Sequence, residues 1–194
     1  MRLYLAQRLA DQFGGKRAAL NAFWYQTQLH LGRFHSYQNF DLAFTQRLVF
    51  VCHGNICRSP YAQRLAQAHG FQSFSFGLNA DPGKTANPMA QQIAGEHGIS
   101  LATHQATHIR DYVPTDGDLV LGFEPVHSQI LERMLEQPGV VISLLGLWHK
   151  PPFAYIHDPY GLNADYFRIC FQRIEEAVLD LLRRLAVMTM EKTS

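Results

Sequence analysis

The sequence predicts an α/β protein: a doubly wound, four-stranded parallel sheet with helices on both faces, plus an N-terminal helical extension. From about residue 48 onward, short apolar runs alternate with longer segments of helical periodicity, as in strand–helix–strand units. The 194 residues, 47% of them hydrophobic and 17% charged, suffice for one domain with a buried core. Right-handed crossovers then place the ligand site at the carboxyl ends of the strands.

The first half of the sheet is predicted from two short strands and the helix between them. Residues 48–51 form an apolar run, typical of a buried strand, that leads directly into Cys52. Pro60 is expected as the first residue of a helix, where a missing amide hydrogen is tolerated. Residues 74–76 are predicted to form the second strand.

The second half follows the same pattern. Asn87, which precedes a proline, is expected to cap a helix that Gly98 ends. A third strand is predicted at residues 119–121, and the next helix is predicted to begin at residues 124–125.

A fourth strand at residues 140–145 and a loop rich in proline and aromatic residues at 146–162 precede the last helix. The apolar face expected for that helix is Phe167, Phe171, Ile174, Val178, Leu181 and Leu185.

The N-terminal residues lie outside this scheme, so the chain is divided into a helical extension, 1–46, and a domain, 47–194. Several apolar residues indicate a helix in the extension: Leu20, Phe23, Trp24 and Leu31. Its role stays open between covering an apolar face, self-association, bringing a partner to the site, and packing alone. The sequence does not indicate an oligomeric state.

Charge and cysteine content limit the functional classes. A net charge of +1 gives no general attraction to nucleic acid, and no segment has the length and apolar character of a membrane span. The N-terminus lacks the features of a secretory signal. Three cysteines do not make a disulfide framework, and a working thiol favours a reducing compartment, so a cytoplasmic location is expected.

The segment that carries chemistry is residues 51–60, Val-Cys-His-Gly-Asn-Ile-Cys-Arg-Ser-Pro, between a strand and a helix start. Backbone amides in such a loop and the positive end of the helix together form a cradle for an anion. Gly54 permits a tight or left-handed turn, and asparagine tolerates such a turn better than most residues. Cys52 would face the cradle as a thiolate, and Arg58 offers a planar fork of donors to a phosphate.

This segment resembles the phosphate-binding loop of the low-molecular-weight protein tyrosine phosphatases, Cys-x-Gly-Asn-Ile-Cys-Arg-Ser-Pro. The resemblance covers about residues 47–187 and implies Cys52 as nucleophile and Arg58 as phosphate clamp. The other loop residues that it implies are His53, Gly54, Asn55, Ile56, Cys57 and Ser59.

Other residues match the family outside the loop. Asp158, in an Asp-Pro-Tyr sequence, is implied as the general acid, with Tyr160 at the rim of the pocket. Ser75 and His104 are implied as supports that hold the loop through Asn55. Ser59 matches the family hydroxyl that assists the thiolate.

The resemblance implies a phosphatase that hydrolyses phosphotyrosine in proteins through a cysteinyl phosphate, with no cofactor and no metal. Ile56 favours this branch over the related protein-arginine phosphatases, which carry threonine there. No aromatic residue follows at 78–82 to stack on a substrate ring, and His53 replaces an apolar rim residue. Gly161 stands in place of a second tyrosine and Thr107 in place of an arginine, which together predict modest activity or an unusual partner.

Two further hypotheses concern the cysteines. Cys57 is expected close to Cys52, so that a reversible disulfide could protect the nucleophile from further oxidation. Cys170 is expected in the core.

Two alternatives stay open. A thiol-dependent arsenate reductase shares this fold and loop, but it needs relay cysteines that the sequence lacks between Cys57 and Cys170. A catalytically weak regulatory module that binds phosphoproteins would need neither nucleophile nor acid.

Overall fold

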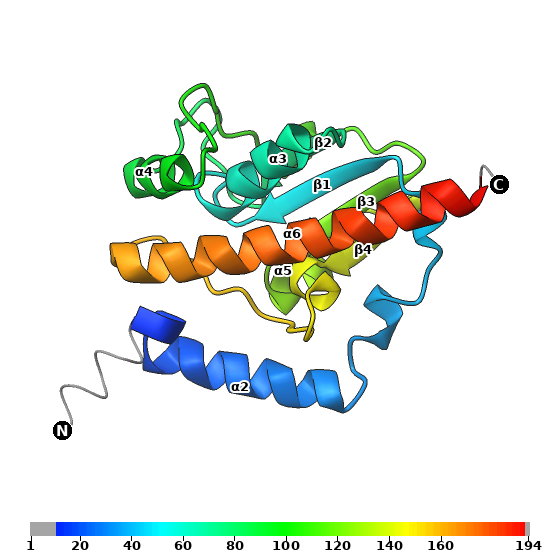
Figure 1. Ribbon diagram of the computed structural model, residues 1–194, viewed down its shortest axis with the longest axis horizontal. Helices are drawn as coiled ribbons and strands as arrows, with labels where there is room; N and C mark the ends of the chain where they lie inside the picture. The colour runs from blue at the N-terminus through cyan, green and yellow to red at the C-terminus, as the bar shows by residue number, and fades with distance from the viewer. Residues whose placement is uncertain (1–10, 193–194) are drawn as a thin grey trace.

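The computed structural model describes residues 11–192. Four parallel strands form one sheet in the spatial order β2-β1-β3-β4, which confirms the predicted sheet (Figure 1). The strands are β1 (Arg47–Cys52), β2 (Ser73–Gly77), β3 (Asp118–Gly122) and β4 (Val140–Leu144). The chain runs outward from β1 to β2 and then returns past β1 to β3. The winding direction therefore reverses beside β1, where doubly wound sheets place their ligands.

Helices cover both faces of the sheet. Helices α3 (Arg58–Ala68), α4 (Pro88–Glu96) and α6 (Ala164–Lys192) pack on one face, and α5 (Pro125–Met134) packs on the other (Figure 1). Alternation along β1 explains the two cores, because Leu48 and Phe50 point toward α6 whereas Val49 and Val51 join the cluster on the opposite face. All four side chains are fully buried.

The local signals set most element boundaries. Asn87 caps α4 by accepting hydrogen bonds from the amides of residues 89 and 90, and Gly98 follows the helix with a φ of 73°. One expectation was wrong: α3 begins at Arg58, two residues before Pro60. Proline is accommodated there because amides in the first turn of a helix have no intrahelical acceptor.

The extension contains α2 (Lys16–His30) and two short 3-10 helices, η1 (His35–Tyr37) and η2 (Leu42–Phe44). Two more 3-10 helices lie in the domain, η3 (Ile109–Asp111) and η4 (Leu145–Trp148). A helix here was expected, but its four apolar marker residues are 60–76% exposed: Leu20, Phe23 and Trp24 in α2, and Leu31 directly after it. The helix instead packs through Tyr25 and Leu29 against a small core beside β4 and η4.

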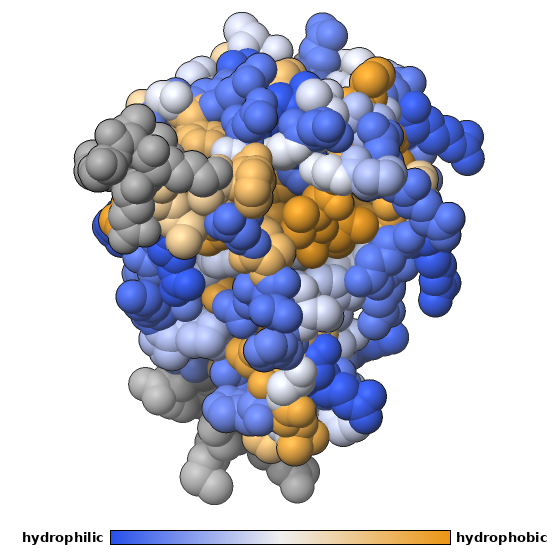
Figure 2. All heavy atoms as spheres, turned by 90° about the vertical axis from the view of Figure 1, so that its right-hand side faces the viewer, coloured by the Kyte–Doolittle hydropathy of each residue, from blue (hydrophilic) through white to orange (hydrophobic). Residues whose placement is uncertain are grey.

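The strands in Figure 1 point toward its left side, so its right side is the end of the sheet away from the loop after Cys52. Figure 2 views that right side, where hydrophobic residues are interspersed among hydrophilic ones. Within the part of the chain that the structure describes, no helix is both long and apolar enough to cross a membrane.

Candidate active site

The loop between β1 and α3 surrounds the sulfur of Cys52, which is 2% exposed. The backbone amide of Asn55 lies 3.3 Å from this sulfur, and the hydroxyl of Ser59 lies 3.1 Å from it. The left-handed residue of the loop is Asn55, with a φ of 54°, and not Gly54. Asparagine adopts this conformation more readily than other residues with a side chain, and here it turns the amide toward the sulfur.

The side chain of Asn55 holds the loop in this shape. Its amide nitrogen donates to the hydroxyls of Ser59 at 2.8 Å and Ser75 at 2.9 Å, and its oxygen accepts from the amide of Thr107 at 2.8 Å. Because the Ser59 oxygen already accepts this bond, its own hydrogen can point at the Cys52 sulfur, 3.1 Å away, or at the carbonyl oxygen of Phe76, 3.4 Å away. Both N–H groups and the oxygen of a fully buried side-chain amide thereby have partners, which favours one loop conformation.

His104 supports the same residue from the other side. Its Nε2 lies 2.7 Å from the carbonyl oxygen of Asn55, and because a carbonyl can only accept, Nε2 carries the hydrogen. Burial lowers the pKa of His104, and the hydrogen bond to Asn55 only partly opposes this effect. The imidazole is therefore a neutral donor at pH 7.

Arg58 lies beneath the loop in a network of acceptors, with its side chain only 1% exposed. Nη1 donates to Glu124 at 2.5 Å and to the carbonyl of Ile156 at 2.8 Å, and Nη2 donates to Asp158 at 2.6 Å. Burial opposes the charge, but Asp158 and Glu124 outweigh it and raise the pKa of Arg58 above its ordinary value. Its Nε is buried without a hydrogen-bond partner among the described residues.

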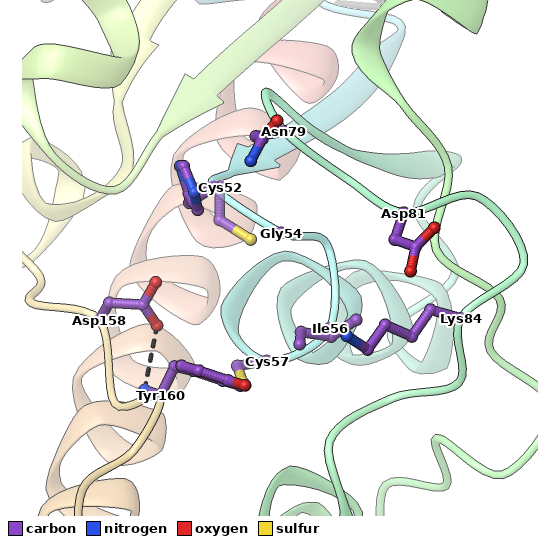
Figure 3. Close-up of a pocket in the computed structure, with 10 residues that line it drawn as sticks. Cys52, Gly54, Ile56, Cys57, Asn79, Asp81, Lys84, Asp158 and Tyr160 are labelled. Carbon is purple, nitrogen blue, oxygen red and sulfur yellow. Dashed lines mark hydrogen bonds between the residues drawn. The ribbon is translucent and has the colours of Figure 1, made fainter.

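A cavity of about 290 Å³ opens over the loop. Figure 3 shows Asp158 and Tyr160 on one side of the Cys52 sulfur, with Asp81 and Lys84 on the other. The amide of Tyr160 donates to Asp158 at 3.2 Å, while the Tyr160 ring is 61% exposed at the rim. The cavity is lined by Cys52, His53, Gly54, Ile56, Cys57, Asn79, Asp81, Lys84, Asp158 and Tyr160.

The sequence pattern of the low molecular weight phosphotyrosine protein phosphatases matches residues 47–191. The chain belongs to this family. Among its relatives is the low molecular weight protein-tyrosine-phosphatase Wzb of Escherichia coli K12, which is 35% identical over 132 residues, 67% of this chain and 88% of the relative.

Solved structures of the family share the fold. The Erwinia amylovora tyrosine phosphatase AmsI is 32% identical with a TM-score of 0.63, over 73% of this chain and 94% of that one. Vibrio vulnificus Wzb in complex with benzylphosphonate is 28% identical with a TM-score of 0.62, over 73% of this chain and 99% of that one.

Most residues singled out in the sequence meet at this phosphatase site, but with two differences from simple expectation. Arg58 does not line the cavity, because Asp158 and Glu124 hold its guanidinium below it. Sequence analysis also missed Glu124, whose only signal is an acidic residue just after β3, the strand beside β1. Two further charged residues at the cavity, Asp81 and Lys84, were missed because they lie in a loop without a motif.

The cysteines differ in their surroundings. Cys57 lines the cavity with Cys52, and burial raises the pKa of its thiol above the ordinary value. Cys170 is fully buried in α6, where burial raises its thiol pKa to about 12. All three are free thiols here, and the disulfide between Cys52 and Cys57 stays a prediction.

Gly77 gives a test of how tightly the loop is packed. A Cβ at this position would lie 2.8 Å from both the Asn55 nitrogen and the His53 oxygen, and these are backbone atoms that cannot move aside. We expect Gly77→Ala to cost about 2 kcal/mol of unfolding free energy and to weaken the binding of inorganic phosphate. Denaturant unfolding and phosphate inhibition measure the two effects.

Gly95→Ala is the matched control. A Cβ there meets nothing within 4 Å, and the residue lies in α4, so this change is expected to be neutral or stabilising. Equal stability and phosphate affinity of Gly77→Ala and the control would show that the loop is not constrained at this contact.

Proposed function

We propose that this protein hydrolyses phosphotyrosine in proteins through a cysteinyl-phosphate intermediate on Cys52. The observation that carries the proposal is the juxtaposition of a buried sulfur, flanked by an amide and a hydroxyl, with a carboxylate in the same cavity. The nearby Arg58 retains an unpaired Nε for which a phosphate oxygen would be an acceptor. Family membership and the phosphatase relatives support this assignment.

Phosphate binding would rearrange the contacts of Arg58. A phosphate in the loop competes with the carboxylate of Asp158 for Nη2, whereas Glu124 and the Ile156 carbonyl keep Nη1 in place. The guanidinium then offers Nη2 and Nε as a parallel pair, a geometry that suits two phosphate oxygens. Asp158, released from Arg58, is left beside the leaving group.

In the first chemical step, the Cys52 thiolate attacks phosphorus and the bond to the tyrosyl oxygen breaks. Asp158 in its protonated form gives its proton to that oxygen, because free tyrosinate is too basic to leave readily. The loop amides and Arg58 hold the other phosphate oxygens, where charge must be stabilised in the transition state.

In the second step, water attacks phosphorus and the phosphorus–sulfur bond breaks. Asp158, now a carboxylate, takes the proton from water, and inorganic phosphate and the Cys52 thiolate are released. Ser59 stabilises this thiolate through its hydroxyl at 3.1 Å. A nucleophilic thiol works in a reducing compartment, and on that ground we place the protein in the cytoplasm.

The test of this function is the effect of Asp158→Asn on two substrates. We expect kcat/KM for a phosphotyrosyl peptide to fall by about 10²–10⁴-fold, since the leaving tyrosinate needs the proton. The loss should be much smaller for p-nitrophenyl phosphate, whose leaving group is a far weaker base. Steady-state kinetics with reductant present measure both values.

Acid quenching during turnover should also trap phosphate on Cys52 in wild type, detected by mass spectrometry of the peptide. Folded wild type that binds phosphate but hydrolyses neither substrate would refute the phosphatase and support a binding module. Equal losses for the two substrates would refute the role of Asp158 as acid.

A further inference from the structure

The extension before β1 contacts the loop that carries Asp158 at several points. The side-chain amide of Asn163 donates to the Asp11 carboxylate at 2.9 Å, and the side-chain amide of Gln26 donates to the backbone carbonyl of Pro152 at 3.3 Å. Near the start of α2, a Cβ on Gly14 would lie 2.6 Å from the His157 ring, so backbone and ring are already in contact. These contacts join residues more than 120 positions apart in the sequence.

Tyr155 is the central link between α2 and this loop. Its ring stacks on Tyr25 with centroids 5.4 Å apart, and its hydroxyl accepts from Asn21 at 3.4 Å. The same hydroxyl lies 2.8 Å from Nδ1 of His157, the residue directly before Asp158. Tyr155 is buried, so its position depends on the helix that covers it.

His157 connects Tyr155 to the acid, Asp158. Its ring lies between Tyr155, with centroids 5.8 Å apart, and Tyr166 of α6, at 5.9 Å. The carbonyl of the preceding residue, Ile156, accepts a hydrogen bond from Arg58. Asp158 itself is 30% exposed in its side chain, so the residues beneath it must supply much of its fixed position.

The contacting helix lies outside the segment that matches the phosphatase family, which begins at residue 47. We propose that α2 is a built-in brace for the acid loop, in which Asn21 and Tyr25 position Asp158 through Tyr155 and His157. This inference rests on the proposed role of Asp158 as general acid. The brace residues are positioning residues, because none of them lines the cavity over Cys52.

A misplaced acid has a specific kinetic signature. It slows the release of basic leaving groups, whereas a weaker pair between Asp158 and Arg58 leaves the loop free to bind phosphate at least as tightly. A displacement of about 1 Å can cost roughly 100-fold in rate, so partial loosening should cost about tenfold. We therefore expect Tyr155→Phe and Tyr25→Leu each to lower kcat/KM for phenyl phosphate about tenfold. For p-nitrophenyl phosphate the loss should stay below about twofold, and the inhibition constant of inorganic phosphate should not rise.

The matched control is Trp24→Ala, on the same helix. Its side chain is 60% exposed, so wild-type values are expected for both substrates. Circular dichroism and thermal unfolding confirm that all three variants are folded at the assay temperature. Wild-type selectivity between the substrates in both brace variants, or equal losses for both substrates, would overturn the brace.

Asp158→Asn, measured beside them, separates this result from failure of the proposed function. A strong leaving-group effect in Asp158→Asn with none in the brace variants overturns the brace alone. No leaving-group effect in Asp158→Asn overturns the acid role, and the brace with it.

Discussion

Cys52→Ser is expected to lower kcat/KM for p-nitrophenyl phosphate by about 10⁴-fold or more, because loss of a nucleophile removes the covalent route. A serine hydroxyl at this position is far less acidic than a thiol and would not form the anion under the same conditions. The hydroxyl of Ser59 and the amide of Asn55 would remain in place around it. Phosphate binding should therefore survive while turnover is lost.

Initial rates and competition by inorganic phosphate measure these two properties separately. Cys170→Ala is the matched control, since it removes a thiol that is fully buried in α6 and does not line the cavity. It should retain most of the activity and lose some stability. Activity of Cys52→Ser within tenfold of wild type would rule out the cysteinyl phosphate.

The parts of the fold that the sequence predicts are those governed by local chemistry. The apolar run before Cys52 forms a strand because it is buried on both faces of a parallel sheet. Asn87 and Gly98 set the ends of α4 through a side-chain cap and a left-handed residue, both readable from neighbouring positions. The loop after Cys52 is of the same kind, since its pattern spans only a few residues.

Contacts between distant segments could not be predicted in this way. Glu124 meets Arg58 only because β3 lies beside β1, and this neighbour relation between residues 66 positions apart is not encoded in the local sequence. The left-handed residue fell at Asn55 and not at Gly54, because the buried side-chain amide compensates for the strained backbone. Part of that compensation comes from Ser75 on a separate strand, a contact that the family resemblance implied but that local chemistry does not predict.

Helix α2 is a second case in which the sequence pattern predicts the element but not its contacts. Its apolar residues mark a helix correctly, yet the large ones, such as Phe23 and Trp24, are exposed. The face that contacts the acid loop contains Asn21 and Tyr25, and a search for hydrophobic periodicity does not single out such polar residues. Their partners lie in an irregular loop with no periodicity, so the contact becomes visible only in three dimensions.

Arg58→Lys is expected to lower kcat/KM for p-nitrophenyl phosphate by about 10²–10³-fold, although it keeps the positive charge. The guanidinium uses Nη1 for Glu124 and Ile156 and offers Nε, and Nη2 once phosphate displaces Asp158, to phosphate. An ammonium cannot divide its donors in this fixed plane. Removing a preorganised hydrogen-bond donor that stabilises charge in the transition state typically lowers the rate by about 10²–10³-fold. The inhibition constant of inorganic phosphate should rise as well.

Glu124→Gln tests whether the anchoring contact contributes. It leaves Arg58 charged and keeps an acceptor for Nη1, so we expect a loss of only about tenfold, because a neutral acceptor holds the guanidinium less firmly than a carboxylate. Thermal unfolding of both variants checks that the buried network survives, since Arg58 is fully buried between two carboxylates. A folded Arg58→Lys variant with activity within fivefold of wild type would contradict the clamp. A loss in Glu124→Gln as large as in Arg58→Lys would instead show that the anchoring of the guanidinium by Glu124 matters as much for activity as the guanidinium itself.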